Sequence, residues 1–181
     1  MPVELEYRGN ETLDDMQAFN ARMNIAWKGD LLFRVYPTPE RIFFIKIGGA
    51  KNQQTAMHFG LIGMLIAHFA NKSEAKKTEE RLQRMTGLRP ALLMKESKDN
   101  HILQVHEISE PTINPRSFWT GNKFGSWSFR NAKGKKRVMK FEDASNFREA
   151  VRWLGEAFGD KLIVNAQWDD TKQKVVKVSN Q

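Results

Sequence analysis

The sequence contains no cysteine, which excludes a disulfide framework, a thiolate-ligated zinc or iron–sulfur centre and a cysteine nucleophile. Its first residues carry no long apolar run of the kind found in secretory signals, so we expect a cytoplasmic location, peripheral to a membrane if attached to one. Phosphate-binding glycine loops, serine nucleophile elbows and zinc-protease histidine pairs are also missing. These absences predict a protein that is not an enzyme and has no cofactor.

The four histidines do not have the spacing of a metal site. His101 and His106 are five residues apart on an expected strand and therefore point to opposite faces. His58 and His68 are ten residues apart on an expected helix, which places them about three turns from each other. We therefore interpret the histidines as structural and predict no metal ligands.

Acidic residues are absent between Pro111 and Phe141, whereas the whole chain has a formal net charge of +8. This stretch contains an expected hairpin with a turn at residues 131–134. Its cations are the candidates for binding an anion or a lipid head group: Lys123, Arg130, Lys133, Lys135, Lys136, Arg137 and Lys140. Such a concentration of positive charge favours phosphates, nucleic acid or anionic lipid as partners.

Aromatic residues are interleaved with these cations over residues 119–140, namely Trp119, Phe124, Trp127 and Phe129. Exposed aromatics beside cations stack nucleic-acid bases while the cations neutralise phosphates. The competing interpretation is that the aromatics alternate inward as core, and that the lysines keep a turn and an edge strand soluble. The sequence favours this second interpretation.

Charged residues are absent from a second stretch, residues 52–71. Its apolar centre, residues 56–70, predicts a helix about 22 Å long, which is shorter than a hydrocarbon core of about 30 Å, so we do not expect a transmembrane span. A ridge of small residues (Ala56, Gly60, Gly63 and Ala67) would let another backbone approach closely. A buried core helix is the favoured interpretation; a homodimer contact and a helix lying in a membrane interface are the alternatives.

Hydrophobic periodicity predicts the remaining elements. We expect an N-capped amphipathic helix from Thr12 to about Trp27, a hairpin of residues 31–36 and 41–47, and helices over 74–85 and 90–94. Strands are expected at 101–108, 111–115 (at a sheet edge), 124–130, 137–141, 162–164 and 175–178. The clearest helix is capped by Ser145 or Asp143 and ends at Gly159.

The run of short strands followed by this helix resembles bacterial pleckstrin-homology-like and GRAM-like domains. Residues 101–108, 125–129, 137–141 and 147–154 carry the resemblance, which extends over about 29–47 and 100–165. It implies a single α+β domain over residues 1–181, with antiparallel strands closed by a C-terminal helix and residues 53–95 as a helical insertion. Domains of this kind bind lipids, bind peptides or act as scaffolds.

We therefore expect a non-catalytic binding module that engages an anionic membrane surface or a protein partner. The alternative is a nucleic-acid-binding protein that uses the basic aromatic hairpin 119–140, and an enzyme without a recognisable motif ranks third. The partners to be tested are an anionic lipid surface, a protein, nucleic acid and a second copy of the chain bound through helix 56–70.

Overall fold

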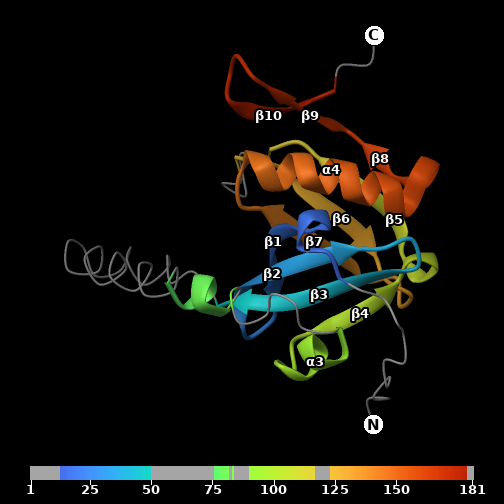
Figure 1. Cartoon of the computed structure of the whole chain (residues 1–181). Helices are drawn as coiled ribbons and strands as arrows, with labels where there is room; N and C mark the ends of the chain where they lie inside the picture. The colour runs from blue at the N-terminus through green and yellow to red at the C-terminus, as the bar shows by residue number, and fades with distance from the viewer. Residues whose placement is uncertain (1–12, 50–75, 82, 84–89, 117–122, 179–181) are drawn as a thin grey trace.

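The structure is a computed structural model that describes residues 13–49, 76–81, 83, 90–116 and 123–178. These residues form a mostly antiparallel sheet of eight strands, a second sheet of two strands, and a few helices (Figure 1). The expected α+β class is confirmed.

Two meanders make up the large sheet. The first contains β1 (Phe19–Ile25), β2 (Gly29–Pro37), β3 (Arg41–Gly48) and β4 (His101–Gln104); the second contains β5 (Ser109–Asn114), β6 (Ser126–Arg130) and β7 (Lys136–Phe141). Pairing of β1 with β7 joins the two meanders, and β8 (Ile163–Val164) pairs in parallel with β5. The strand order is therefore β4-β3-β2-β1-β7-β6-β5-β8. The small sheet is formed by β9 (Ala166–Asp169) and β10 (Lys174–Lys177).

The helix α4 (Ala144–Phe158) covers the inner side of the large sheet, and the small sheet lies beyond it (Figure 1). Asp143 caps the helix by accepting a hydrogen bond of 2.8 Å from the backbone N of Asn146, and Gly159 ends it with φ 54°. Its apolar stripe packs into the main core with the inward side chains of the strands: Phe147, Ala150, Leu154 and Phe158. The predicted helix boundaries are confirmed, and Asp143 rather than Ser145 is the cap.

A second, smaller core lies on the outer face of β2 and β3. The short helix α3 (Pro90–Lys95) supplies Leu93, which packs with Leu32, Phe43 and Ile45. Because β3 is buried on both faces, its sequence Ile42-Phe43-Phe44-Ile45 is continuously apolar rather than alternating. The predicted β2–β3 hairpin and the predicted helix over 90–94 are both confirmed.

The predicted N-terminal helix is wrong. Asp15–Gln17 form one 3-10 turn, and the following residues form the strand β1. Phe19, Ala21 and Met23 are buried at every second position, as in a strand. Because Ala21 is small and only weakly apolar, Phe19 and Met23 dominate the sequence pattern, and their spacing of four residues also fits a helix. Thr12, the expected cap, lies outside the described residues.

The predicted edge strand at 111–115 is also wrong, because β5 pairs on one side with β6 and on the other with β8. Pro111 lacks the N–H that an interior strand needs, and it lies at a register shift between Ser109 and Thr112. A bulge at this point removes the requirement for a cross-strand hydrogen bond. The predicted strand 101–108 is shorter than expected: β4 ends at Gln104 and a 3-10 turn follows.

The expected insertion 53–95 lies in the connection from β3 to β4. Residues 76–81 and 83 are helical, in agreement with the predicted helix over 74–85, and α3 follows. The apolar stretch 56–70, including Ala56, Gly60, Gly63 and Ala67, lies outside the described residues. In the part of the chain that the structure describes, no helix has the length and hydropathy needed to cross a membrane.

Candidate functional site

The turn between β6 and β7 is built by a single asparagine. The Asn131 side-chain oxygen accepts hydrogen bonds from the backbone N of Lys133 at 3.2 Å and of Lys135 at 3.0 Å. Gly134 closes the turn at φ 70°, and its N donates to the Asn131 carbonyl at 2.7 Å. These bonds hold the backbone that carries the lysines in one conformation.

Among the described residues, some cations of the β6–β7 hairpin form ion pairs and others do not. Arg130 forms an ion pair with Glu110 at 3.0 Å, and Lys140 forms one with Asp30 at 3.3 Å. Lys133, Lys135 and Lys136 are exposed, and no ion pair of theirs occurs within the described ranges. The positive charge that remains available to a partner is therefore concentrated at the turn.

The two other predicted candidates lie apart from this turn. Lys123 is exposed and precedes β6 at its far end from the turn. Arg137 is half-buried, and it lies close enough to His101 to lower the pKa of that imidazole. Neither has an ion pair in the described part of the chain. Of the seven cations predicted from the sequence, three therefore lie exposed together at the turn: Lys133, Lys135 and Lys136.

The aromatic side chains of the hairpin belong to the core. Trp127 is 0% exposed and Phe129 is 2% exposed, and their rings are in contact with each other, with centroids 4.4 Å apart. They have no free face on which a nucleic-acid base could stack. Phe124 is partly buried against the same core, and Trp119 lies outside the described residues.

An exposed tryptophan that sequence reasoning missed lies in the turn between β1 and β2. Trp27 is fully exposed, at 105% of the reference area, and has φ 68°, a left-handed conformation that non-glycine residues rarely adopt. Lys28 N donates to the Ile25 carbonyl at 2.9 Å and closes the turn. The sequence analysis expected a helix that ends near Trp27, and it therefore did not predict an exposed turn at this residue.

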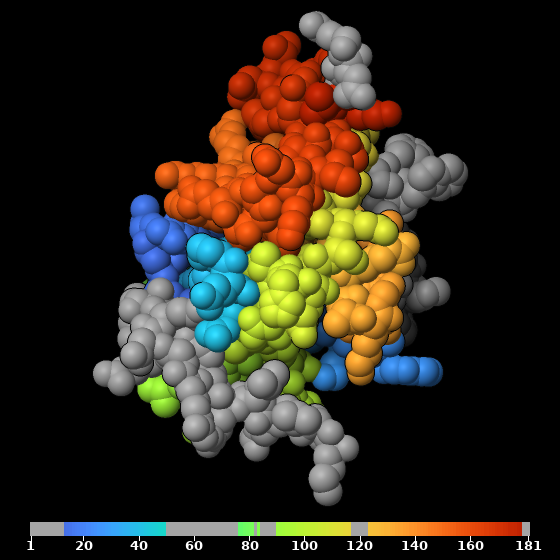
Figure 2. Space-filling view, turned by 90° about the vertical axis from the view of Figure 1, so that its right-hand side faces the viewer, coloured from blue at the N-terminus to red at the C-terminus, as the bar shows by residue number. Residues whose placement is uncertain are grey.

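The β1–β2 and β6–β7 turns extend from the same end of one strand pair. Antiparallel β1 and β7 are in register at Ala21–Phe141 and Met23–Met139. Beyond Met23, β1 leads to the Trp27 turn, and in the same direction β7 leads back to the lysine turn. Figure 2 shows the orange β6–β7 hairpin with the projecting blue segment of the β1–β2 region below it. Val138, which is 40% exposed, lies on β7 two residues after Lys136.

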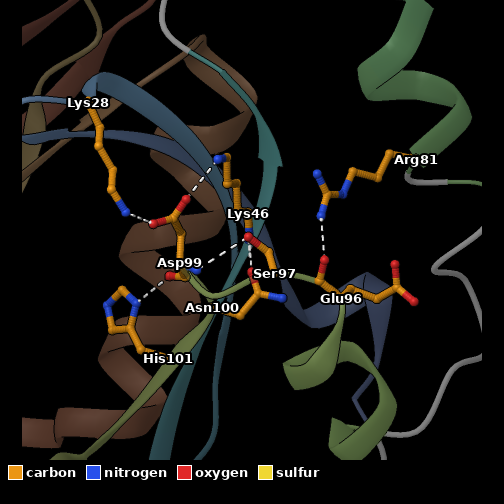
Figure 3. Close-up of polar contacts among 8 residues, drawn as sticks. All are labelled: Lys28, Lys46, Arg81, Glu96, Ser97, Asp99, Asn100 and His101. Atoms are coloured by element: carbon orange, nitrogen blue, oxygen red, sulfur yellow. Dashed lines mark hydrogen bonds and ion pairs between the residues drawn. The ribbon is translucent and has the colours of Figure 1, made fainter. Parts of the chain in front are cut away.

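A buried polar cluster holds the base of the β1–β2 turn (Figure 3). The Asp99 carboxylate forms ion pairs with Lys28 and, at 2.8 Å, with Lys46, and only 5% of its side chain is exposed. Asn100 accepts from the Lys46 backbone N at 2.7 Å and donates to the Leu93 carbonyl at 2.6 Å. The hydrogen bonds from both lysines lower the pKa of Asp99 to about 2. Because every partner in this cluster is internal, we assign it a structural role.

His101 is a half-buried titratable group near this end of the sheet. Its ring stacks on Phe44 with centroids 4.6 Å apart and planes 5° apart, and its Nδ1 lies 2.9 Å from the Asp99 carbonyl oxygen. Burial lowers the pKa of His101, and Arg137 lowers it further. No group of three or more histidine, aspartate or glutamate side chains in the described ranges could hold a metal ion. His58 and His68 lie outside those ranges.

Comparison with protein-family models, with curated proteins and with solved structures gave no match. The chemistry of the site is therefore argued from its own residues.

Proposed function

We propose that this chain is a non-catalytic binding module with a pleckstrin-homology-like core, and that it engages an anionic membrane surface through the β6–β7 turn. The two meanders, with strand order β4-β3-β2-β1-β7-β6-β5, and the helix α4 that follows β7 support the resemblance stated from the sequence. In terms of this resemblance, the segment between β3 and β4 is an insertion into the pleckstrin-homology-like core.

The observation that carries the proposal is that three lysines at one rigid turn have no ion pair among the described residues. Lys133, Lys135 and Lys136 are exposed within four consecutive residues, and the turn backbone is fixed by Asn131. The nearby Glu110 is already paired with Arg130, so it does not neutralise the lysines. Fixed, unpaired cations attract a negatively charged surface and lose little conformational freedom when they bind.

The magnitude of this attraction favours a surface over a single small anion. A lysine close to an anionic membrane contributes about 1 kcal/mol, so three contribute about 3 kcal/mol. A membrane surface presents many head groups, so each of the three exposed lysines can contribute to binding at the same time. The proposal therefore names an anionic bilayer as the partner.

Nucleic acid shares the negative charge but gains less from this hairpin. Base stacking adds about 1–3 kcal/mol per base in proteins that bind single strands. Trp127 and Phe129 are core residues and cannot supply it. A nucleic-acid role would therefore depend on the lysines alone.

The test is flotation with vesicles of phosphatidylcholine alone or with 30 per cent phosphatidylserine (a typical choice, roughly matching an anionic leaflet). The variant Lys133→Glu/Lys135→Glu reverses two charges at the turn. The control variant Lys161→Glu/Lys177→Glu makes the same change in net charge at two exposed positions in the C-terminal region, outside the β6–β7 turn.

We expect the wild type and the control variant to float with anionic vesicles and the turn variant to lose at least tenfold in partition coefficient, as expected from removing and reversing two contributions of about 1 kcal/mol. An equal loss of binding in both variants would mean that the overall net charge of the protein, rather than the β6–β7 turn, causes the binding. Absence of wild-type binding to anionic vesicles at low salt would exclude the membrane function and leave a protein partner to be sought.

A further inference from the structure

The β1–β2 turn exposes a large aromatic side chain in a backbone conformation that does not favour it. Trp27 is fully exposed and has φ 68°, whereas Gly29, two residues later and with φ 74°, is the residue type expected in this region of backbone conformation. A left-handed tryptophan is unfavourable for folding, and full exposure means that packing within the described chain does not compensate for it. Within the described residues, the fold therefore gives no structural reason for a tryptophan at this position.

The surroundings of Trp27 hold its position firmly. Lys28, the next residue, is tied to Asp99, which is also bound to Lys46 on β3. The turn is closed by the hydrogen bond from Lys28 N to the Ile25 carbonyl. A rigid backbone that presents an exposed indole reduces the entropy lost when that indole is buried in a partner.

We propose that Trp27 is an interfacial anchor that inserts its indole into the head-group region of the bilayer when the lysine turn engages the membrane. The inference rests on the proposed function. Both turns extend from the same end of the β1–β7 pair, and Val138 adds an exposed apolar side chain between Lys136 and Lys140 on the outer face of β7. Indole rings are favoured at membrane interfaces because they combine an apolar ring with an N–H donor.

An anchor also adds an apolar contribution to the free energy of membrane binding. Electrostatic attraction by a few lysines gives weak, salt-sensitive attachment, and stable attachment of a peripheral protein takes two signals. The lysine turn supplies the electrostatic signal and Trp27 supplies the apolar one. The anchor favours a lipid bilayer over nucleic acid, because nucleic acid has no apolar layer into which an indole could insert.

The variant Trp27→Gly separates a membrane role from a structural one. Glycine relieves the left-handed strain, so we expect the urea midpoint of unfolding to stay the same or rise, while the partition coefficient on anionic vesicles falls about tenfold. Trp27→Phe should retain most of the binding. Met16→Ala is the matched control: Met16 is 80% exposed but precedes β1, at the opposite end of the strand from Trp27, and its removal should leave binding unchanged.

A second readout locates the indole. The chain contains five tryptophans, so the contribution of Trp27 is the difference between the wild type and Trp27→Phe. Vesicles that contain brominated phosphatidylcholine should quench the fluorescence of the wild type more strongly than that of Trp27→Phe. Unchanged partitioning of Trp27→Gly would overturn the anchor. So would quenching that is equal in the wild type and Trp27→Phe. If the anchor fails while Lys133→Glu/Lys135→Glu still abolishes binding, the proposed function stands without it; if the wild type does not bind, both fail.

Discussion

At the scale of single residues, Asp99 joins the start of β4 to two segments that are distant in the sequence. Its carboxylate binds Lys28 in the β1–β2 turn and Lys46 on β3, and its backbone carbonyl contacts His101 at the start of β4. A carboxylate this buried is stable in its charged form only while both lysines remain in place. The position of the β1–β2 turn, and therefore of Trp27, depends on this contact.

We predict that Asp99→Asn lowers the free energy of unfolding by about 2 kcal/mol, because two charge-assisted hydrogen bonds are lost at a buried site. The control is Asp30→Asn, which removes a more exposed pair with Lys140 and should lower it by less than about 1 kcal/mol. Urea denaturation at pH 7 measures both. Since the pKa of Asp99 is lowered to about 2, its contribution is present above about pH 4 and is lost as the pH falls toward 2. Equal effects of the two substitutions would contradict the structural role of Asp99.

His101 makes stability depend on pH in a different window. Burial beside Phe44 lowers the pKa of the imidazole in the folded state, so below pH 6.5 the unfolded chain binds the proton more readily. We predict that the urea midpoint falls between pH 7.5 and pH 5.5, and that His101→Phe, which retains the ring, reduces this fall. The exposed His106→Gln is the control and should retain the wild-type slope. An unchanged slope in His101→Phe would show that other groups cause it.

At the scale of elements, glycines with the same backbone conformation differ in their surroundings. Gly125 precedes β6 with φ 77°, and a Cβ added there would lie 2.6 Å from the Asn114 carbonyl oxygen. Gly134 in the lysine turn has φ 70°, and a Cβ there would meet nothing within 4 Å. The first position needs glycine for both conformation and space, whereas the second needs it for conformation alone.

We therefore predict that Gly134→Ala lowers the free energy of unfolding by about 1 kcal/mol, the usual cost of a left-handed alanine. Gly125→Ala should lower it by at least about 3 kcal/mol, because the β5–β6 contact must also move. Thermal and urea unfolding of the two variants provide the comparison. Similar losses would mean that β5 and β6 accommodate the methyl group, and that the close approach is not a constraint on the fold.

The elements that could be predicted from the sequence are those with an unambiguous period. The stripe and caps of α4 and the β2–β3 hairpin are local patterns, and both are confirmed. In β1, by contrast, Phe19 and Met23 fit either a helix or a strand, and only the pairing with β2 and β7 decides between them. Pro111 can occupy the interior strand β5 because it lies at a bulge, and no local sequence pattern predicts that bulge.

The candidate site was predictable in part for the same reason. An acid-free run of lysines beside a turn is visible in the sequence, and the structure places Lys133, Lys135 and Lys136 together at that turn. The pairing of Arg130 with Glu110 and of Lys140 with Asp30 depends on tertiary contacts. The exposure of Trp27 depends on the correct assignment of β1, so it could not be predicted once a helix was expected there.

At the scale of the whole molecule, basic side chains outnumber acidic ones and give a net charge of +8, and some of the basic side chains are engaged in internal ion pairs. What distinguishes the lysine turn is that its charge is exposed and fixed, and that it lies at the end of the β1–β7 pair that also carries Trp27. Attraction between exposed charges is screened over about 10 Å at 0.1 M salt, whereas burial of an indole is not. Membrane attachment should therefore have a salt-sensitive and a salt-resistant part.

The measurement that tests the central claim most directly is the partition coefficient of the wild-type protein on anionic and on zwitterionic vesicles between low and high salt. We predict binding to anionic vesicles that weakens steeply as salt rises, weak binding to zwitterionic vesicles, and loss of the anionic preference in Lys133→Glu/Lys135→Glu. Equal partitioning on both vesicle types, or no binding to either at low salt, would contradict the claim that this chain engages an anionic membrane surface.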